Sequence, residues 1–173
     1  MGVLEKVAAA EFLGMEFATW LFYNSYQNNG KLTIPGLEPF ELWFESPVTM
    51  ASDYGEATQV TLKGGTPLEG PEAQSAFLAG KKISRVKVRI NLRNQTYSFS
   101  FNPLNFNVSG LRLPAPPGAE GPDYAFVRLE IFEEFEKFIG ELFQAYMVVR
   151  ADDKKWPGES EAIKAWIRDL AGT

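Results

Sequence analysis

The chain has 173 residues, of which 45% are hydrophobic and 14% aromatic, and its formal net charge is -5. This length and composition predict one globular domain over residues 1–173, and they exclude a disordered chain. Because the sequence has no cysteine and no histidine, it excludes disulfides, thiolate nucleophiles, histidine general bases and the usual zinc sites. The acidic balance argues against a protein that coats nucleic acid all over.

The first residues, MGVLEKVAAAEF, lack the long apolar core of a signal peptide. The apolar run from Phe17 to Tyr23 is far shorter than the roughly 20 residues that a membrane-spanning helix needs. We therefore expect a soluble, cytoplasmic protein with no membrane partner.

Residues 3–27 are predicted to form a long helix. Apolar side chains recur there at helical spacing, and several aromatic residues widen the apolar surface. Such a helix must be covered on more than one side. Asn28, Asn29 and Gly30 follow, and these residue types are typical of a helix end.

The middle of the chain is rich in predicted strands. In FELWFES (residues 40–46), Phe40, Leu42 and Phe44 alternate with Glu41, Trp43 and Glu45. In TQVTLK (residues 58–63), Thr58, Val60 and Leu62 alternate with Gln59, Thr61 and Lys63. Gly64 and Gly65 interrupt the second strand. A short helix is expected from Pro71 to Leu78, since proline suits the first turn of a helix and Gly80 follows its end.

A hairpin is predicted from KKISRVKVRINLR (residues 81–93) and TYSFSFN (residues 96–102), with Asn94 and Gln95 between them. Both segments alternate with a period of two, which gives the hairpin one apolar and one polar face. The apolar side chains of the first segment are those of Val86, Val88, Ile90 and Leu92. The opposite face carries Arg85, Lys87, Arg89 and Arg93.

The last third of the chain is predicted to be helical. Residues 109–123 are rich in proline and glycine and indicate a loop. A long helix follows from Asp123 to about Val149, and a last amphipathic helix runs from Glu159 to Leu170. The predicted fold class is therefore α+β, with a largely antiparallel sheet packed by a long N-terminal helix and C-terminal helices.

The basic segment 81–93 is the main candidate site. It contains six of the 17 basic residues and no acidic residue. The rest of the chain has 11 basic and 22 acidic residues, which is a formal net charge of -11. Same-face residues on a strand lie roughly 6.6 Å apart, so Arg85, Lys87, Arg89 and Arg93 would form a straight row suited to a phosphate backbone. The candidate DNA-contacting residues are Lys81, Lys82, Arg85, Lys87, Arg89 and Arg93. Alternatively, the cations serve to keep a solvated or edge strand from aggregating.

Aromatic platforms for nucleic-acid bases are less evident. Tyr97, Phe99 and Phe101 alternate with serine and threonine, which favours a place in the core. Trp43 is expected on the outer face, but its neighbours Glu41 and Glu45 would repel phosphate.

No pattern indicates an enzyme, a cofactor or a metal site. The glutamates of the 123–149 helix indicate a solvated face. Asp152 and Asp153 are followed at once by Lys154 and Lys155, which suits a helix end better than a metal site. Neither a glycine-rich phosphate loop nor a nucleophile elbow is present.

Five segments together resemble a known family. They are FLGMEFATWLFYNSY, GKLTIPG, FELWFESPVTM, QVTLKGGTPL and FNPLNFNVSGLRLP. The chain resembles the RdgC-like recombination-associated proteins, in the compact form found in some bacteria, from about Phe12 to Pro114. The resemblance implies a non-enzymatic, dimeric protein that binds DNA without sequence preference, in recombination or replication. Because it carries no motif for individual DNA contacts, the candidate residues depend on charge pattern alone.

Two other functions remain open. The chain could be a protein–protein interaction or oligomerisation module without DNA affinity, because its aromatic-rich helices offer more apolar surface than a small sheet needs. A carboxylate-dependent nuclease is the third hypothesis, and nicking of plasmid DNA with magnesium would expose it.

Overall fold

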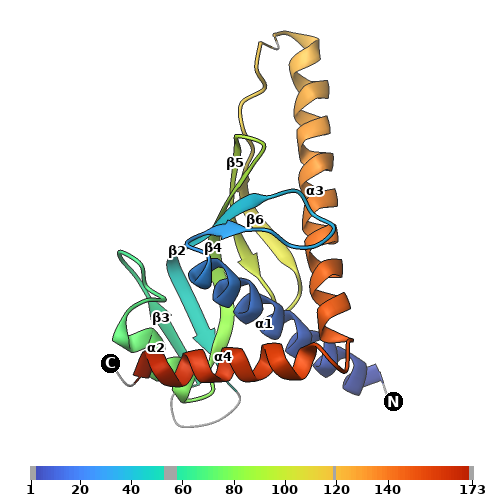
Figure 1. The fold of residues 1–173 in the computed structure, drawn as a ribbon. Helices are drawn as coiled ribbons and strands as arrows, with labels where there is room; N and C mark the ends of the chain where they lie inside the picture. The colour runs from blue at the N-terminus through green and yellow to red at the C-terminus, as the bar shows by residue number, and fades with distance from the viewer. Residues whose placement is uncertain (1–2, 53–57, 119, 172–173) are drawn as a thin grey trace.

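Figure 1 shows the computed structural model of the chain, which describes residues 3–52, 58–118 and 120–171. Its elements are α1 (Val3–Gln27), β1 (Lys31–Leu32), β2 (Phe40–Ala51), β3 (Gln59–Leu62), α2 (Pro71–Leu78), β4 (Lys82–Leu92), β5 (Gln95–Asn102), β6 (Asn107–Arg112), α3 (Pro122–Arg150) and α4 (Trp156–Ala171).

The described strands form one six-stranded sheet with the order β1-β2-β4-β5-β6, and β3 pairs with β2 beside this path. Every pairing in it is antiparallel. The alternation in the sequence explains this sheet, because one side of each long strand is apolar and the other polar. The predicted α+β fold is confirmed.

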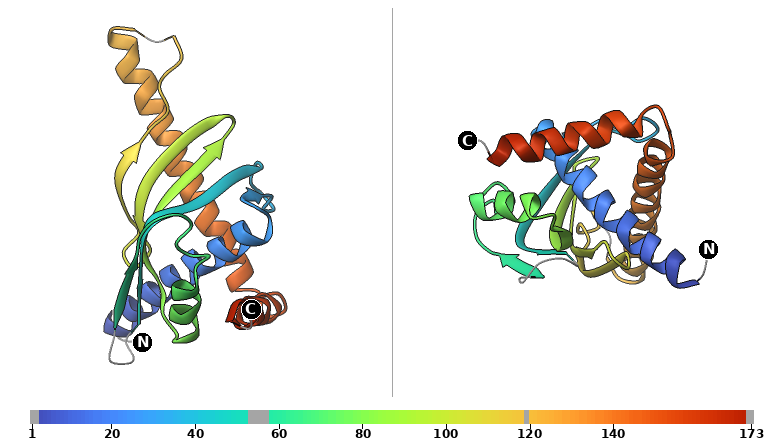
Figure 2. Two further views of the ribbon diagram at one scale, coloured as in Figure 1. Left: turned by 90° about the vertical axis from the view of Figure 1, so that its left-hand side faces the viewer. Right: turned by 90° about the horizontal axis from the view of Figure 1, so that it is seen from below.

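The core lies between the sheet and two helices, α1 and α3, which cover the same face (Figures 1 and 2). Phe17 of α1 contacts Phe101 of β5 edge to face at 6.2 Å between ring centroids. On α3, Phe138 meets Phe40 of β2 at 5.0 Å, and Phe135 meets Phe99 at 5.1 Å. Large aromatic rings therefore join both helices to the sheet.

The helix α4 packs against α2 and against aromatic residues near the end of α1. Its buried Trp166 lies 5.4 Å from Phe22 of α1 and 6.0 Å from Phe77 of α2, between ring centroids. Tyr23 and Tyr26 of α1 also lie 5.5 Å from Trp166, between ring centroids, so α4 covers part of the broad apolar surface of that helix.

Two local expectations were wrong. Residues 109–112 were predicted as loop but belong to β6, an edge strand whose register with β5 shifts between Ser98 and Ser100. Only a few of its side chains are partly covered, so its apolar pattern is weak. The hairpin turn consists of Arg93 and Asn94, with φ of 51° and 62°, because Leu92 pairs with Gln95.

The first part of α3 extends past the sheet (Figure 1). We call residues 122–130 the arm. Its exposed apolar residues are Tyr124, Phe126 and Leu129, with Phe126 at 69% exposure. None of the helices in the described part of the chain has both the length and the apolar character needed to cross a bilayer.

Candidate nucleic-acid interface on the open sheet face

The face of the sheet opposite α1 and α3 is here called the open face, because no helix of the described ranges packs on it (Figure 2). Strand register brings side chains from four strands together there. One row consists of Trp43, Arg89, Ser98 and Arg112, and the next of Glu45, Lys87, Ser100 and Ser109. Arg85 continues this face opposite Thr49. The open face is therefore polar and rich in cations.

A single carboxylate holds two of the predicted DNA-contacting residues. Glu45 of β2 lies 3.3 Å from Nζ of Lys87 and 3.0 Å from Nε of Arg89. Both ion pairs are partly exposed to solvent, so each contributes little to stability. They do lower the positive potential of the open face, because one negative charge lies between two positive ones.

The predicted row of cations is only partly continuous. Arg85, Lys87 and Arg89 share the open face, but Arg93 does not extend the row, because β4 ends at Leu92 and Arg93 has a left-handed φ of 51°. Its guanidinium instead binds both carboxylate oxygens of Glu38, with Nη2 at 2.8 Å from Oε1. This hydrogen bonding lowers the pKa of the Glu38 carboxyl. The expectation of a straight row that includes Arg93 was wrong.

The two lysines at the start of the basic segment also lie away from the row. Lys81 is buried, at 9% exposure, and its Nζ lies 3.5 Å from Oγ of Ser52. Lys82 is half-buried on the helix side of the sheet, within electrostatic reach of Glu16. Both lysines precede the alternating row of Arg85, Lys87, Arg89 and Arg93, and the β2–β4 register shifts beside them, between Thr49 and Met50.

Two other residues on the open face, Arg112 and Trp43, lie in the same row as Arg89. Arg112 of β6 is exposed and lies opposite Ser98, in the same row as Arg89. Arg112 was not predicted to join this face, because residues 109–123 were predicted to form a loop. Trp43 is half-buried and covers Gly30, where an added Cβ would lie 2.2 Å from Cζ2 of the indole. One side of the indole is therefore taken up by packing.

The net charge of the open face decides what it can bind. Lys31, Arg85, Lys87, Arg89 and Arg112 of its strands are cationic, while Glu41 and Glu45 are acidic, a surplus of three positive charges. In the described residues, no group of three or more acidic side chains is arranged to hold a metal ion. The arrangement suits contact with phosphate groups, and it offers no set of donors that would read base edges.

Comparison of the chain with family models, with curated proteins and with solved structures gives no match. The resemblance to RdgC-like proteins therefore stays a hypothesis.

Proposed function

We propose that this chain is a non-enzymatic protein that binds DNA weakly and without sequence specificity through the open face, in recombination or replication. The observation that carries the proposal is the gathering of Arg85, Lys87, Arg89 and Arg112 from two strands on one uncovered face. This cluster belongs to a protein whose overall charge is -5. The resemblance to RdgC-like proteins points the same way.

The chemistry of the open face fits a phosphate backbone. Arg89 and Arg112 lie on strands separated by β5, so their backbones are roughly 10 Å apart. Ser98 lies between them in the same row, and its hydroxyl is a further donor to phosphate oxygens. Contacts of this kind give affinity and orientation but no sequence information. The carboxylate of Glu45 limits the affinity, which is why we propose weak binding.

The proposal is tested by fluorescence anisotropy with labelled single- and double-stranded DNA over a salt series. If four phosphates are contacted, log K falls with log salt at a slope of about -3 to -4. The variant Arg85→Gln/Arg112→Gln removes two cations that form no ion pair with another described residue. We expect its slope to be shallower by about 1.4 to 1.8.

The matched control is Lys154→Gln/Lys155→Gln, which changes the net charge equally in the turn between α3 and α4. Both control lysines are exposed. Equal loss in the two variants would show a general charge effect and contradict binding by the open face. No binding at about 50 mM salt, where the electrostatic contribution is strong, would exclude the proposed function.

The arm supports a second candidate, an oligomerisation module without DNA affinity. Phe126 and Leu129 are 69% and 53% exposed, and their spacing of three residues puts them on one side of α3. A second copy of the chain would bury them. Light scattering after size exclusion tests this with Phe126→Ser/Leu129→Ser beside Leu78→Ser/Val148→Ser, whose targets are exposed elsewhere. A dimer that dissociates only in the arm variant supports this candidate, and a monomeric wild type excludes it.

A further inference from the structure

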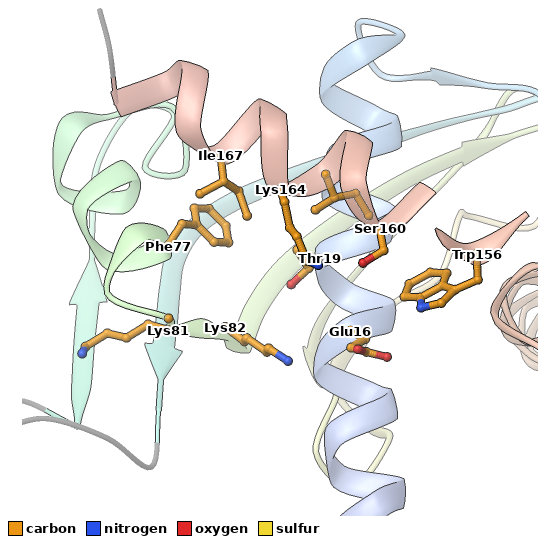
Figure 3. A pocket seen from close by; sticks show the side chains of 11 residues that line it. Glu16, Thr19, Phe77, Lys81, Lys82, Trp156, Ser160, Lys164 and Ile167 are labelled. Carbon is orange, nitrogen blue, oxygen red and sulfur yellow. The ribbon is translucent and has the colours of Figure 1, made fainter. Parts of the chain in front are cut away.

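The Trp43 ring on β2 has no aromatic or cationic partner, unlike the rings of the other tryptophans. Trp20 and Trp166 are buried among rings of the core. Trp156 lines a cavity among α1, α4 and the α2–β4 junction (Figure 3), and the Arg150 guanidinium lies 4.7 Å from the centre of its ring. None of the described residues forms a ring contact, a cation–π contact or a hydrogen bond with the Trp43 side chain.

The backbone of Gly30 holds one side of the Trp43 ring in place. An added Cβ at Gly30 would lie 2.2 Å from Cζ2 of the indole. The Gly30 N–H donates to the carbonyl of Ser25 at 2.7 Å, and its carbonyl accepts from the N–H of Leu42 at 2.8 Å. Trp43 is only half-buried, so part of the ring stays accessible. A ligand that stacks there meets a ring that is already ordered, which lowers the entropy cost of binding.

Charged side chains surround Trp43 on the open face. They are Lys31, Glu41, Glu45, Lys87 and Arg89. Glu41 and Glu45 are the nearest along β2, roughly 6.6 Å away on either side. Arg89 lies opposite Trp43 but pairs with Glu45 at 3.0 Å. The two carboxylates disfavour a phosphate over β2, yet their oxygens can accept hydrogen bonds from the amino groups of bases.

The cations that are open to phosphate lie farther along the sheet. Arg85 of β4 and Arg112 of β6 form no ion pair with another described residue. Arg112 shares a row with Trp43, and β6 is three strand spacings, roughly 14 Å, from β2. The open face thus has an aromatic ring with carboxylates on β2 and unpaired arginines on β4 and β6. A nucleic-acid strand fits this division when its backbone lies over β4 to β6 and a base lies over β2.

We propose that the open face prefers single-stranded to duplex DNA, because the Trp43 ring stacks on one unpaired base while Arg85 and Arg112 contact phosphates. This inference rests on the proposed function and names the class of DNA that the open face binds. In a duplex each base is paired and stacked on its neighbours, and taking it out costs free energy. Stacking on an aromatic side chain depends little on the base, so the preference brings no sequence specificity.

The test compares three labelled ligands of equal length on the wild-type protein by fluorescence anisotropy. They are an oligothymidylate, a strand with the same sugar–phosphate backbone but no bases, and a duplex. We expect the oligothymidylate to bind more tightly than the abasic strand by about fivefold or more. Their salt slopes should be equal, because both strands present the same phosphates. At about 150 mM salt, where phosphate contacts are weakened, the oligothymidylate should also bind more tightly than the duplex.

The result separates this inference from the proposed function. If the abasic strand or the duplex binds as tightly as the oligothymidylate, the preference for single strands is overturned, while DNA binding by the open face stands. If none of the three ligands binds, both are overturned. This comparison uses the unaltered chain and does not depend on the folding of a variant.

Variants assign the stacking to Trp43. Trp43→Leu removes the ring, and we expect affinity for the oligothymidylate to fall by about fivefold or more, with affinity for the abasic strand unchanged. Trp43→Phe keeps a smaller ring and should retain part of the affinity. Phe126→Leu removes an exposed ring from the arm and should bind like the wild type. If Trp43→Leu binds the oligothymidylate as tightly as Phe126→Leu does, the assignment to Trp43 is wrong.

Discussion

Glu16 of α1 forms an ion pair with Arg150 at the C-terminal end of α3, with 2.9 Å between Oε2 and Nε. The two residues are 134 positions apart in the sequence. Their side chains are 16% and 30% exposed, respectively, and the Arg150 guanidinium also lies 4.7 Å from the centre of the Trp156 ring. The pair therefore connects α1, α3 and the start of α4 in a partly buried setting.

Replacing the charge of Glu16 should destabilise the fold. Glu16→Gln leaves the Arg150 guanidinium without its carboxylate, and we expect the free energy of unfolding to fall by about 1 to 3 kcal/mol. Urea denaturation measures the change. Glu141→Gln breaks an exposed pair with Lys137 and should cost about 0.5 kcal/mol or less. An equal loss of unfolding free energy in both variants would show that the Glu16–Arg150 pair stabilises the fold no more than an exposed pair does.

Tyr146 should make the protein lose stability in alkali. Burial raises the pKa of this fully buried tyrosine well above its ordinary value near 10, and the adjacent Glu16 carboxylate raises it further. Above about pH 10 the unfolded chain releases the proton while the folded chain keeps it, so the free energy of unfolding falls as pH rises. The contribution approaches about 1.4 kcal/mol per pH unit.

The variant Tyr146→Phe separates this contribution from others. We expect the decline in unfolding free energy between about pH 10 and 11.5 to be smaller than in the wild type, as measured by urea denaturation at several pH values. Some decline should remain, because burial also raises the pKa of Tyr97. A variant with the same pH dependence as the wild type would contradict the assignment to Tyr146.

The elements that the sequence predicts well depend on short-range patterns. Val86, Val88 and Ile90 alternate with Arg85, Lys87 and Arg89, and this alternation alone places two sets of side chains on opposite faces. The long helices follow equally from apolar spacing, and α1 has the predicted bounds of residues 3–27. Local periodicity is enough here because each of these elements has one strongly apolar face.

The candidate interface depends on how strands that are distant in the sequence pair with one another. The spacing of residue types along one strand does not predict this register. Nothing local to the basic segment indicates that Glu45 lies opposite Lys87, or that Arg112 shares a row with Arg89. The place of Arg93 depends on a left-handed turn. A charge pattern therefore identified three open-face cations but could not tell which partners reduce their charge.

Shortening a side chain should affect the free energy of unfolding much less on the arm than in the buried part of α3. Phe135→Ala removes a buried ring that contacts Tyr97 and Phe99, and we expect a loss of about 3 to 5 kcal/mol in unfolding free energy. Phe126→Ala changes a side chain that is 69% exposed, with an expected effect within about 0.5 kcal/mol. Chemical denaturation at low protein concentration measures both. A large loss for Phe126→Ala would mean that the arm is covered in solution.

Gly30 should tolerate no side chain beneath Trp43. Its φ is +77°, and an added Cβ would lie 2.2 Å from Cζ2 of the indole. We expect Gly30→Ala to cost about 3 kcal/mol in unfolding free energy, of which about 1 is backbone strain and the rest overpacking. Gly36→Ala supplies the strain alone, because φ there is +88° and nothing lies within 4 Å. The excess over Gly36→Ala should disappear in a Trp43→Ala background, and its persistence would exclude the indole as its cause.

Glu45 should limit the affinity of the open face for DNA. Glu45→Gln removes the carboxylate that lies 3.3 Å from Lys87 and 3.0 Å from Arg89, so one negative charge no longer offsets the charge of these two cations. We expect tighter binding and a salt slope steeper by about 0.7 to 0.9, equivalent to one more neutralised phosphate. Anisotropy across a salt series measures both, beside Glu141→Gln, which changes the net charge equally on α3. If the two variants bind DNA alike, the gain reflects overall charge, and the phosphate contacts do not involve Lys87 and Arg89.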